Sequence, residues 1–208
     1  MIARSSIVLV GAAFLALMVA FAHQAQAQQP QNVRVRGEIT AVDGPVLTVK
    51  ARDGAELKIR LADNAAVSGI VKTELADIKT GSYIGVSAMP QPDGSQRALH
   101  VHIFPEAMRG TAEGHFPWDA RPSSTMTNAT VAQTVAGVDG QTITVKYKDG
   151  EKKIVVPPEA PIVTYVPGDK GDLKPGAKIF IVAAQKQPDG TLSAARISVG
   201  RDGLTPPM

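Results

Sequence analysis

The sequence repeats itself at a nearly constant spacing, and this repeat limits the possible folds more than any other feature. Segment 41–54 returns at 137–150, 96 positions later, with the same two Asp-Gly pairs. Further on, 77–81 is echoed at 172–176 and the Gln-Pro-Asp-Gly sequence of 91–94 at 187–190. Matches at a near-fixed offset indicate a duplicated unit. Features that only one copy carries are therefore the better candidates for a functional site.

Each copy alternates β-strand patterns with turn signals. Residues 33–42 alternate apolar and polar side chains, as a half-buried strand does. Asp-Gly pairs then mark tight turns, because glycine adopts positive φ without steric cost. The strands expected in the first copy are 33–42, 46–51, 56–61, 83–88 and 97–104, with one helical turn at 73–79. Those expected in the second copy are 134–138, 142–147, 152–156, 178–183 and 193–199.

Three strands, a helical turn and two more strands are the order of a small Greek-key barrel of the OB type. We therefore predict an all-β protein of two tandem five-stranded OB-like Greek-key barrels, joined by an aromatic-containing connector. The barrels are expected at 28–104 and 132–208, with the connector at 105–131. A β-sandwich or another small barrel would have the same strand pattern and stays open as an alternative.

The first copy also resembles a known group of domains. The resemblance lies in Gly37-Glu38-Ile39-Thr40-Ala41-Val42-Asp43-Gly44, in Leu47-Thr48-Val49 and in Asp77-Ile78-Lys79-Thr80-Gly81. These segments are similar to bacterial exported OB-like barrel domains of unknown function. There, a G-x-I-x-x-V-x-G-x-x-L-T-V opening and an L-K-x-G-x-x-V entry to the fourth strand recur. The resemblance covers both copies but not the connector. It implies a fold and no catalytic residues.

The first 27 residues have the pattern of a secretory signal peptide. Arg4 supplies the positive charge, residues 7–22 are apolar, and Ala25-Gln26-Ala27 fits the cleavage rule. The apolar run is shorter than the roughly 20 residues of a spanning helix, which favours a cleaved signal over an uncleaved anchor. Cleavage after Ala27 would place the mature chain in the periplasm, with membrane contact only during export. The chain has no cysteine, which excludes a disulfide and a lipidated cysteine.

Composition argues against several classes of function. The chain has 22 Lys and Arg against 19 Asp and Glu, a net charge of +3, and removal of 1–27 takes away Arg4 and leaves +2. So small an excess is not typical of a nucleic-acid surface. No nucleophile elbow surrounds Ser123 or Ser124. We therefore predict that the protein is not an enzyme and does not bind nucleic acid.

The connector carries large aromatic residues that an idle linker lacks. It contains Phe116 and Trp118, the single tryptophan of the chain. Linkers are usually rich in Gly, Ser or Pro. One interpretation is that these rings staple the two barrels together, because buried aromatic area dominates interface energetics. The other is an exposed docking site for a ligand.

Three histidines, close together in the sequence, are the candidate metal ligands. His100 and His102 are two apart on an expected strand, so their side chains share one face. Their counterparts in the second copy are Arg196 and Ser198, so the barrel does not require them. His115, with Met108 and Met126, would complete a site for copper or zinc. Ordinary surface histidines are the alternative, and no cofactor is firmly implied.

Two hypotheses of function follow. The first is a non-catalytic periplasmic binding or accessory protein, with a protein, a peptide or an envelope component as its ligand. The second is a periplasmic copper- or zinc-binding protein that uses the three histidines. The sequence does not indicate an oligomeric state.

Overall fold

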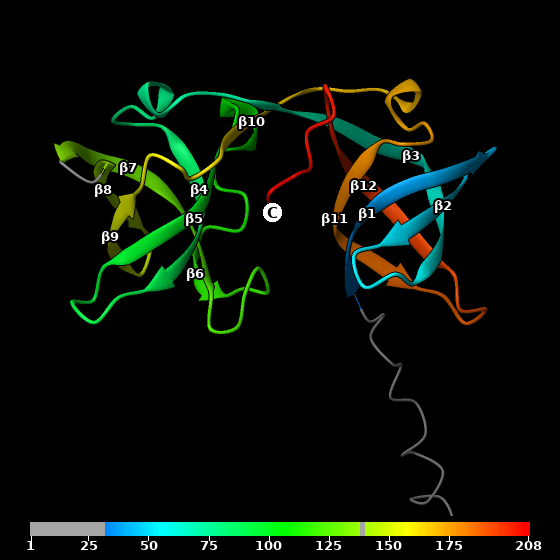
Figure 1. Ribbon diagram of the computed structural model, residues 1–208, viewed down its shortest axis with the longest axis horizontal. Helices are drawn as coiled ribbons and strands as arrows, with labels where there is room; N and C mark the ends of the chain where they lie inside the picture. The colour runs from blue at the N-terminus through cyan, green and yellow to red at the C-terminus, as the bar shows by residue number, and fades with distance from the viewer. Residues whose placement is uncertain (1–31, 138–139) are drawn as a thin grey trace, which may run out of the picture. The chain divides into compact units, whose positions relative to one another are not determined.

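The computed structural model describes residues 32–137 and 140–208, and these residues form an all-β protein. The expected signal peptide and the Val138-Asp139 part of one turn lie outside the described residues. The strands are β1 (Asn32–Asp43), β2 (Val46–Ala51), β3 (Glu56–Lys72), β4 (Tyr83–Pro90), β5 (Gln96–Ile103), β6 (Gly114–Pro117), β7 (Thr125–Gly137), β8 (Gly140–Tyr147), β9 (Gly150–Val156), β10 (Ile162–Pro167), β11 (Lys178–Lys186) and β12 (Leu192–Gly200) (Figure 1). Short 3₁₀ turns are η2 (Leu75–Asp77), η3 (Glu106–Met108) and η4 (Lys170–Asp172).

The strands close into two rings of five. In the first ring β1 pairs with β2, β2 with β3, β3 with β12, β12 with β11, and β11 with β1. In the second ring the order is β7, β8, β9, β5, β4 and back to β7. One pair in each ring is parallel, β3 with β12 and β5 with β9, and the others are antiparallel. We call these barrel A and barrel B.

The two copies of the repeat exchange strands, which differs from the predicted tandem arrangement. Strands β4 and β5 were expected to close a barrel within 28–104, but they pair with β7, β8 and β9. In return, β11 and β12 complete barrel A. Each barrel therefore has three strands from one copy and two from the other. The boundary expected near 104 does not separate two barrels.

The exchange follows from the length of β3. This strand continues to Lys72, and its last residues pair with β10 instead of turning back. Its counterpart in the second copy is divided into β9 and β10 by Pro157 and Pro158, which lack the N–H that a ladder needs. β10 also pairs in parallel with β5, so it joins strands of both barrels.

The β3–β10 pairing is symmetric with respect to the repeat. Ile70 lies opposite Tyr165, and Gly69 lies opposite Val166. Positions 69 and 70 correspond to 165 and 166 at the repeat offset of 96. The repeat therefore converts each of these two pairs into the other. This is the self-complementary pattern of a twofold interface between identical subunits. The chain is built like a strand-exchanged dimer whose two halves are fused.

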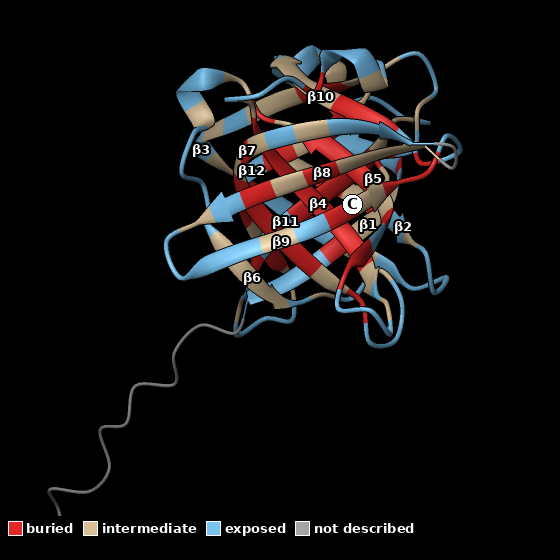
Figure 2. Cartoon of the chain, turned by 90° about the vertical axis from the view of Figure 1, so that its left-hand side faces the viewer, coloured by how far each residue is buried: buried red, intermediate tan, exposed pale blue. Residues whose placement is uncertain are grey.

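Each barrel has its own core of alternate, inward-facing residues. In barrel A these include Ile39, Leu47 and Ile59, and in barrel B they include Val86, Ile143 and Ile154, all fully buried. Figure 2 shows barrel B with buried residues on alternate strand positions and exposed residues at the turns (Figure 2). No helix within the described ranges is long and apolar enough to span a bilayer.

The predicted connector 105–131 is largely ordered structure. It contains η3 and β6, and β6 pairs with β7 from Gly114 to Pro117. Strand β7 begins at Thr125, nine residues before the strand expected at 134. Tyr83 Oη and Asn128 Nδ2 both donate to the carbonyl of Thr111, which fixes the segment against β4 and β7.

Candidate functional site

The histidine pair lies on the outer face of barrel B and is nevertheless buried. On β5, His100 lies opposite Ser87 and His102 opposite Gly85. The two imidazoles are 2 % and 4 % exposed, with ring centroids 5.9 Å apart. Directly opposed residues of an antiparallel pair share one face. Asn128 lies opposite Gly85 on the other side, so it also belongs to this face.

Gly85 provides the space that His102 occupies. A Cβ at Gly85 would lie 2.0 Å from His102 Nε2 and 2.6 Å from Asn128 Oδ1. Barrel A has the reverse combination at the equivalent pair, where Phe180 lies opposite Ser198. A small residue faces a large one in both barrels, but the imidazole belongs to barrel B alone.

Aromatic rings enclose the histidines. Phe104 meets His102 edge-on at 4.6 Å between centroids and stacks on Tyr165 at 5.7 Å. Tyr165 also meets His102 edge-on at 5.9 Å. Because Tyr165 comes from β10, this cluster joins the crossing strand to the face of β5.

Burial keeps both histidines neutral. Desolvation, together with the positive charges of Arg36 and Arg52, lowers the pKa of His100 to about 4. Desolvation, with a smaller contribution from His100, lowers the pKa of His102 to about 3. Within the described residues, His100 Nε2, His102 Nδ1, Ser87 Oγ and Asn128 Oδ1 are buried without a hydrogen-bond partner. Such groups cost about 1–3 kcal/mol each, so their grouping on one face marks it as a candidate site.

The structure does not bring His115 to the pair. His115 on β6 lies opposite Thr127, and its Nδ1 is 2.8 Å from Thr127 Oγ1. Thr127 in turn lies opposite Val86, and Val86 lies opposite Val101. Both valines face the core of barrel B. His115 is therefore on the opposite face of the sheet, because neighbouring positions of a strand point to opposite sides.

The predicted methionine ligands are placed differently from each other. Met126 lies opposite Ser87, on the face of His100, and is 2 % exposed. Met108 ends η3. No group of three His, Cys, Asp or Glu side chains in 32–137 and 140–208 is arranged to hold a metal ion.

Trp118 lies where segments of both barrels meet. It is half-buried and packs against a cluster formed by Ile70, Val163, Phe180 and Met208. The Arg34 guanidinium of β1 lies 4.0 Å from the centroid of the Trp118 ring. Phe116 meets Trp118 at 6.1 Å between centroids. The ring thus contacts barrel A and still leaves part of its surface exposed.

An ion pair fixes the loop that carries Trp118. Asp119 accepts from Arg36 Nη2 at 2.7 Å and Nη1 at 3.1 Å, and lies 3.5 Å from Arg34 Nη1. The hydrogen bond from Arg36 holds the pKa of Asp119 below its usual value. Ser124 Oγ donates to the carbonyl of Trp118 at 3.0 Å, and Trp118 N donates to Ser124 O at 2.8 Å. We call Arg34, Arg36, Trp118, Tyr165 and Phe180 the junction residues.

Among the junction residues, only Trp118 is recognisable as a candidate from the sequence. Arg34 and Arg36 alternate on β1 like ordinary outward-facing residues, and their partner Asp119 is 83 positions from Arg36. The asymmetry between the copies was the one available signal, since Phe180 stands where barrel B has Gly85.

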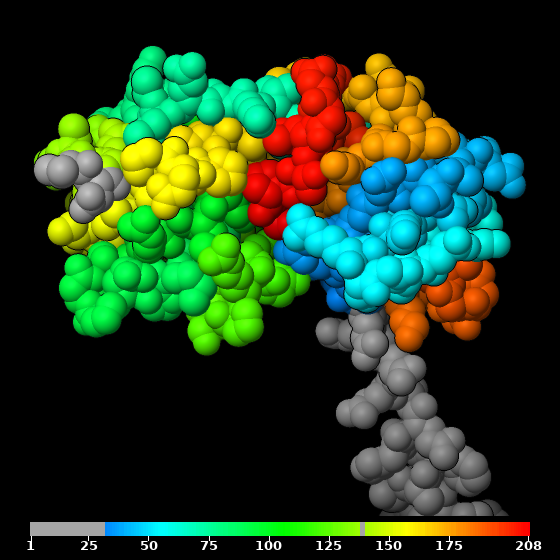
Figure 3. Space-filling view, in the orientation of Figure 1, coloured from blue at the N-terminus to red at the C-terminus, as the bar shows by residue number. Residues whose placement is uncertain are grey.

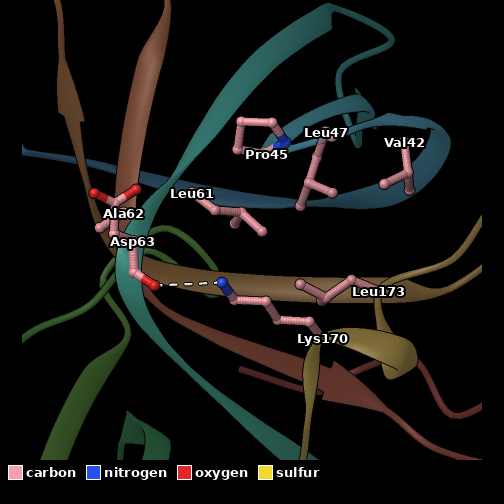
Figure 4. Close-up of a pocket in the computed structure, with 9 residues that line it drawn as sticks. Val42, Pro45, Leu47, Leu61, Ala62, Asp63, Lys170 and Leu173 are labelled. Carbon is pink, nitrogen blue, oxygen red and sulfur yellow. Dashed lines mark hydrogen bonds between the residues drawn. The ribbon is translucent and has the colours of Figure 1, made fainter.

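A small hollow at one end of barrel A is a second candidate. It encloses about 190 Å³ between the β1–β2 turn, β3 and η4, with Val42, Leu47, Leu61 and Leu173 among its walls (Figure 4). Lys170 Nζ donates to the carbonyl of Asp63 across its mouth at 3.3 Å. The counterpart of Lys170 is Leu75, which packs against the core of barrel B. The hollow is smaller than the roughly 300–1,000 Å³ of typical ligand pockets.

Comparison of the chain with models of known protein families, with curated proteins and with solved structures finds no match.

Proposed function

We propose that this is a non-catalytic periplasmic binding or accessory protein built from two OB-like barrels, and that its ligand is a protein or peptide. The pairing order of each ring supports the OB-like assignment, because the first strand pairs with the fourth and the third with the fifth. The signal-peptide pattern of residues 1–27 supports export.

The single observation that carries the proposal is the half-buried Trp118, whose ring lies beneath Arg34. Tryptophan and arginine are enriched among the residues that dominate protein–protein binding energy. Here they are pre-positioned, since Asp119 orients both Arg34 and Arg36. A rigid aromatic and cationic surface of this kind loses little conformational entropy on binding.

The test compares Arg34→Glu with Arg97→Glu. Arg97 is a matched control, an arginine ion-paired to Glu159 on barrel B. A partner retained from periplasmic extract by the wild-type chain would be identified, purified and titrated by calorimetry. We expect Arg34→Glu to weaken its binding at least tenfold and Arg97→Glu to leave the Kd unchanged. Equal loss in both variants, or no partner whose binding depends on Arg34, would contradict the proposal.

The unpartnered nitrogen atoms of His100 and His102 favour a second candidate, a copper or zinc site. Two neutral imidazoles with Met126 on the same face form a donor set that suits Cu(I). The nearby charges of Arg36 and Arg52 oppose a cation there. Calorimetry with Cu(I) or Zn²⁺ tests it: saturable binding should disappear in His102→Ala and persist in Ser198→Ala, the counterpart control. No saturable uptake by the wild-type chain would reject a metal site.

A further inference from the structure

Residues 204–208 form a strap that follows β12 and lies along the junction. Leu204 is half-buried, Thr205 exposed, Pro206 buried, Pro207 half-buried, and Met208 only 2 % exposed. Alternate residues therefore face inward. Two consecutive prolines restrict φ and favour an extended chain. In Figure 3 the strap, in red, is visible at the surface beside residues of β1 and β2 (Figure 3).

The strap is held by contacts that peptide-binding sites use. Arg36 Nε donates to the main-chain oxygen of Met208 at 2.5 Å, and Arg52 Nη2 donates to the Pro206 carbonyl at 3.3 Å. The Met208 side chain fills the cluster of Ile70, Val163 and Phe180, and Trp118, Tyr165 and Leu204 border it. Main-chain oxygen atoms and alternate apolar side chains are thus recognised, while the strap adds no strand to either ring.

Gly200, the last residue of β12, leaves the space in which the strap crosses the strand. A Cβ at Gly200 would lie 1.8 Å from the carbonyl oxygen of Leu204, so only glycine lets the strap cross here. The counterpart of Gly200 is Phe104, which instead packs on His102 and Tyr165. We call the surface that the strap covers, formed by Arg36, Arg52, Ile70, Val163, Phe180 and Gly200, the strap groove. It is specific to one half of the molecule.

We propose that the strap groove is a binding site for an extended, proline-containing peptide, and that residues 204–208 occupy it in cis. The partner segment would carry apolar side chains at alternate positions with a proline between them, as Leu204, Pro206 and Met208 do. Arg34, Arg36 and Arg52 outnumber Asp119, so the groove also favours a neutral or acidic segment over a basic one. This inference rests on the proposed binding function and names the class of partner.

Occupation in cis makes the strap a competitor. A tethered segment has an effective concentration of about millimolar, so an added peptide binds weakly until the strap is released. Met208→Asp should release it, because the carboxylate would enter an apolar cluster. Thr205→Asp is the matched control, since it adds the same charge to the exposed side of the strap.

The experiment titrates the full-length variants with a labelled synthetic peptide of sequence Gly-Leu-Thr-Pro-Pro-Met. Trp118, the single tryptophan, borders the groove and reports its occupancy by fluorescence. We expect the peptide to bind Met208→Asp at least tenfold more tightly than wild type or Thr205→Asp, and to restore the wild-type emission. Adding Arg52→Gln should reverse that gain, because Arg52 donates to the Pro206 carbonyl.

Three results would overturn the inference. The first is that the peptide shows no saturable binding to folded Met208→Asp. The second is that a scrambled peptide binds equally well. The third is that the wild-type chain forms dimers that Met208→Asp abolishes, because a second copy would then be the occupant of the groove. Met208→Ser provides a milder release if the aspartate variant loses its circular dichroism. A partner that depends on Arg34 while no peptide binds would reject the strap groove and leave the proposed function standing.

Discussion

His102 is one of the side chains by which the outer face of barrel B differs from its counterpart on barrel A, where serine stands. Its place depends on Gly85, and Gly85→Ala would put a methyl group on the imidazole. We expect this change to lower the free energy of unfolding by about 1–3 kcal/mol, as overpacking does. The double variant Gly85→Ala, His102→Ser should recover much of the loss, because serine is the residue of barrel A at this position. Urea titrations of the single and double variants measure the coupling, and purely additive losses would contradict the steric explanation.

The same histidines should make stability depend on pH. Their folded-state pKa values are about 4 and 3, below the ordinary value of 6.5, so the unfolded chain binds protons that the folded chain does not. Above pH 6.5 both states are neutral and nothing changes. As pH falls from 6.5 toward 4, stability should decrease, by about 3–5 kcal/mol per histidine once the folded pKa is reached.

Urea titrations between pH 7.5 and 4.5 check this expectation. The variant His100→Gln, His102→Gln should lose most of the slope, although its absolute stability will also change. His115→Gln should keep most of it, since His115 is only half-buried. An unchanged slope in the double variant would show that other groups cause the acid sensitivity.

At the scale of elements, the loop after β6 joins the barrels through Trp118. Because the ring is half-buried, Trp118→Ala should cost about 2 kcal/mol, less than the roughly 3–5 of a fully buried aromatic residue. Arg34→Ala should cost under about 1 kcal/mol, as exposed cation–π contacts do. Thermal unfolding followed by circular dichroism measures both. An unchanged melting temperature for Trp118→Ala would mean that the ring serves only a ligand.

The strands themselves were predictable, and their partners were not. Alternation placed β2 at 46–51 as observed, and glycines of the Asp-Gly pairs, such as Gly44 and Gly190, adopt the expected positive φ. The helical suggestion at 73–79 became the 3₁₀ turn η2. The strand partners were predicted wrongly because the sequence is duplicated. β4 and β11 have similar patterns, so either could pair with β1, and the length of β3 determines that β11 does.

The site was less predictable than the fold. Spacing placed His100 and His102 on one face, as observed, because that inference needs only the period of a strand. Whether His115 lies near His100 and His102 depends on which face of the sheet its side chain points to. The four-residue sequence of β6, which ends in proline, does not specify this face. The junction residues come from β1, the loop after β6, β10 and β11, which are far apart in sequence.

For the whole molecule, strand exchange predicts one cooperative unfolding transition. Neither copy can close a barrel alone, since each ring takes two strands from the other copy. Trp118 fluorescence and far-ultraviolet circular dichroism should therefore give coincident urea curves. Ile59→Ala in barrel A and Ile154→Ala in barrel B, both fully buried positions, should shift the same single transition. Two separated transitions would show that the barrels unfold independently.

The strand exchange also determines the order in which the two barrels can close when the chain emerges from its N-terminus. Asn32 of β1 pairs with Gln185, so the first three strands are released long before the strands that complete their barrel. Until β11 and β12 follow, both edges of that sheet present open N–H and C=O groups, which recruit strands of other molecules. Barrel B, whose strands lie between these segments, can close earlier. The β1–β3 sheet of the nascent chain is therefore open to pairing with other molecules for the longest time. We expect holdase-type chaperones to bind this sheet rather than the later strands.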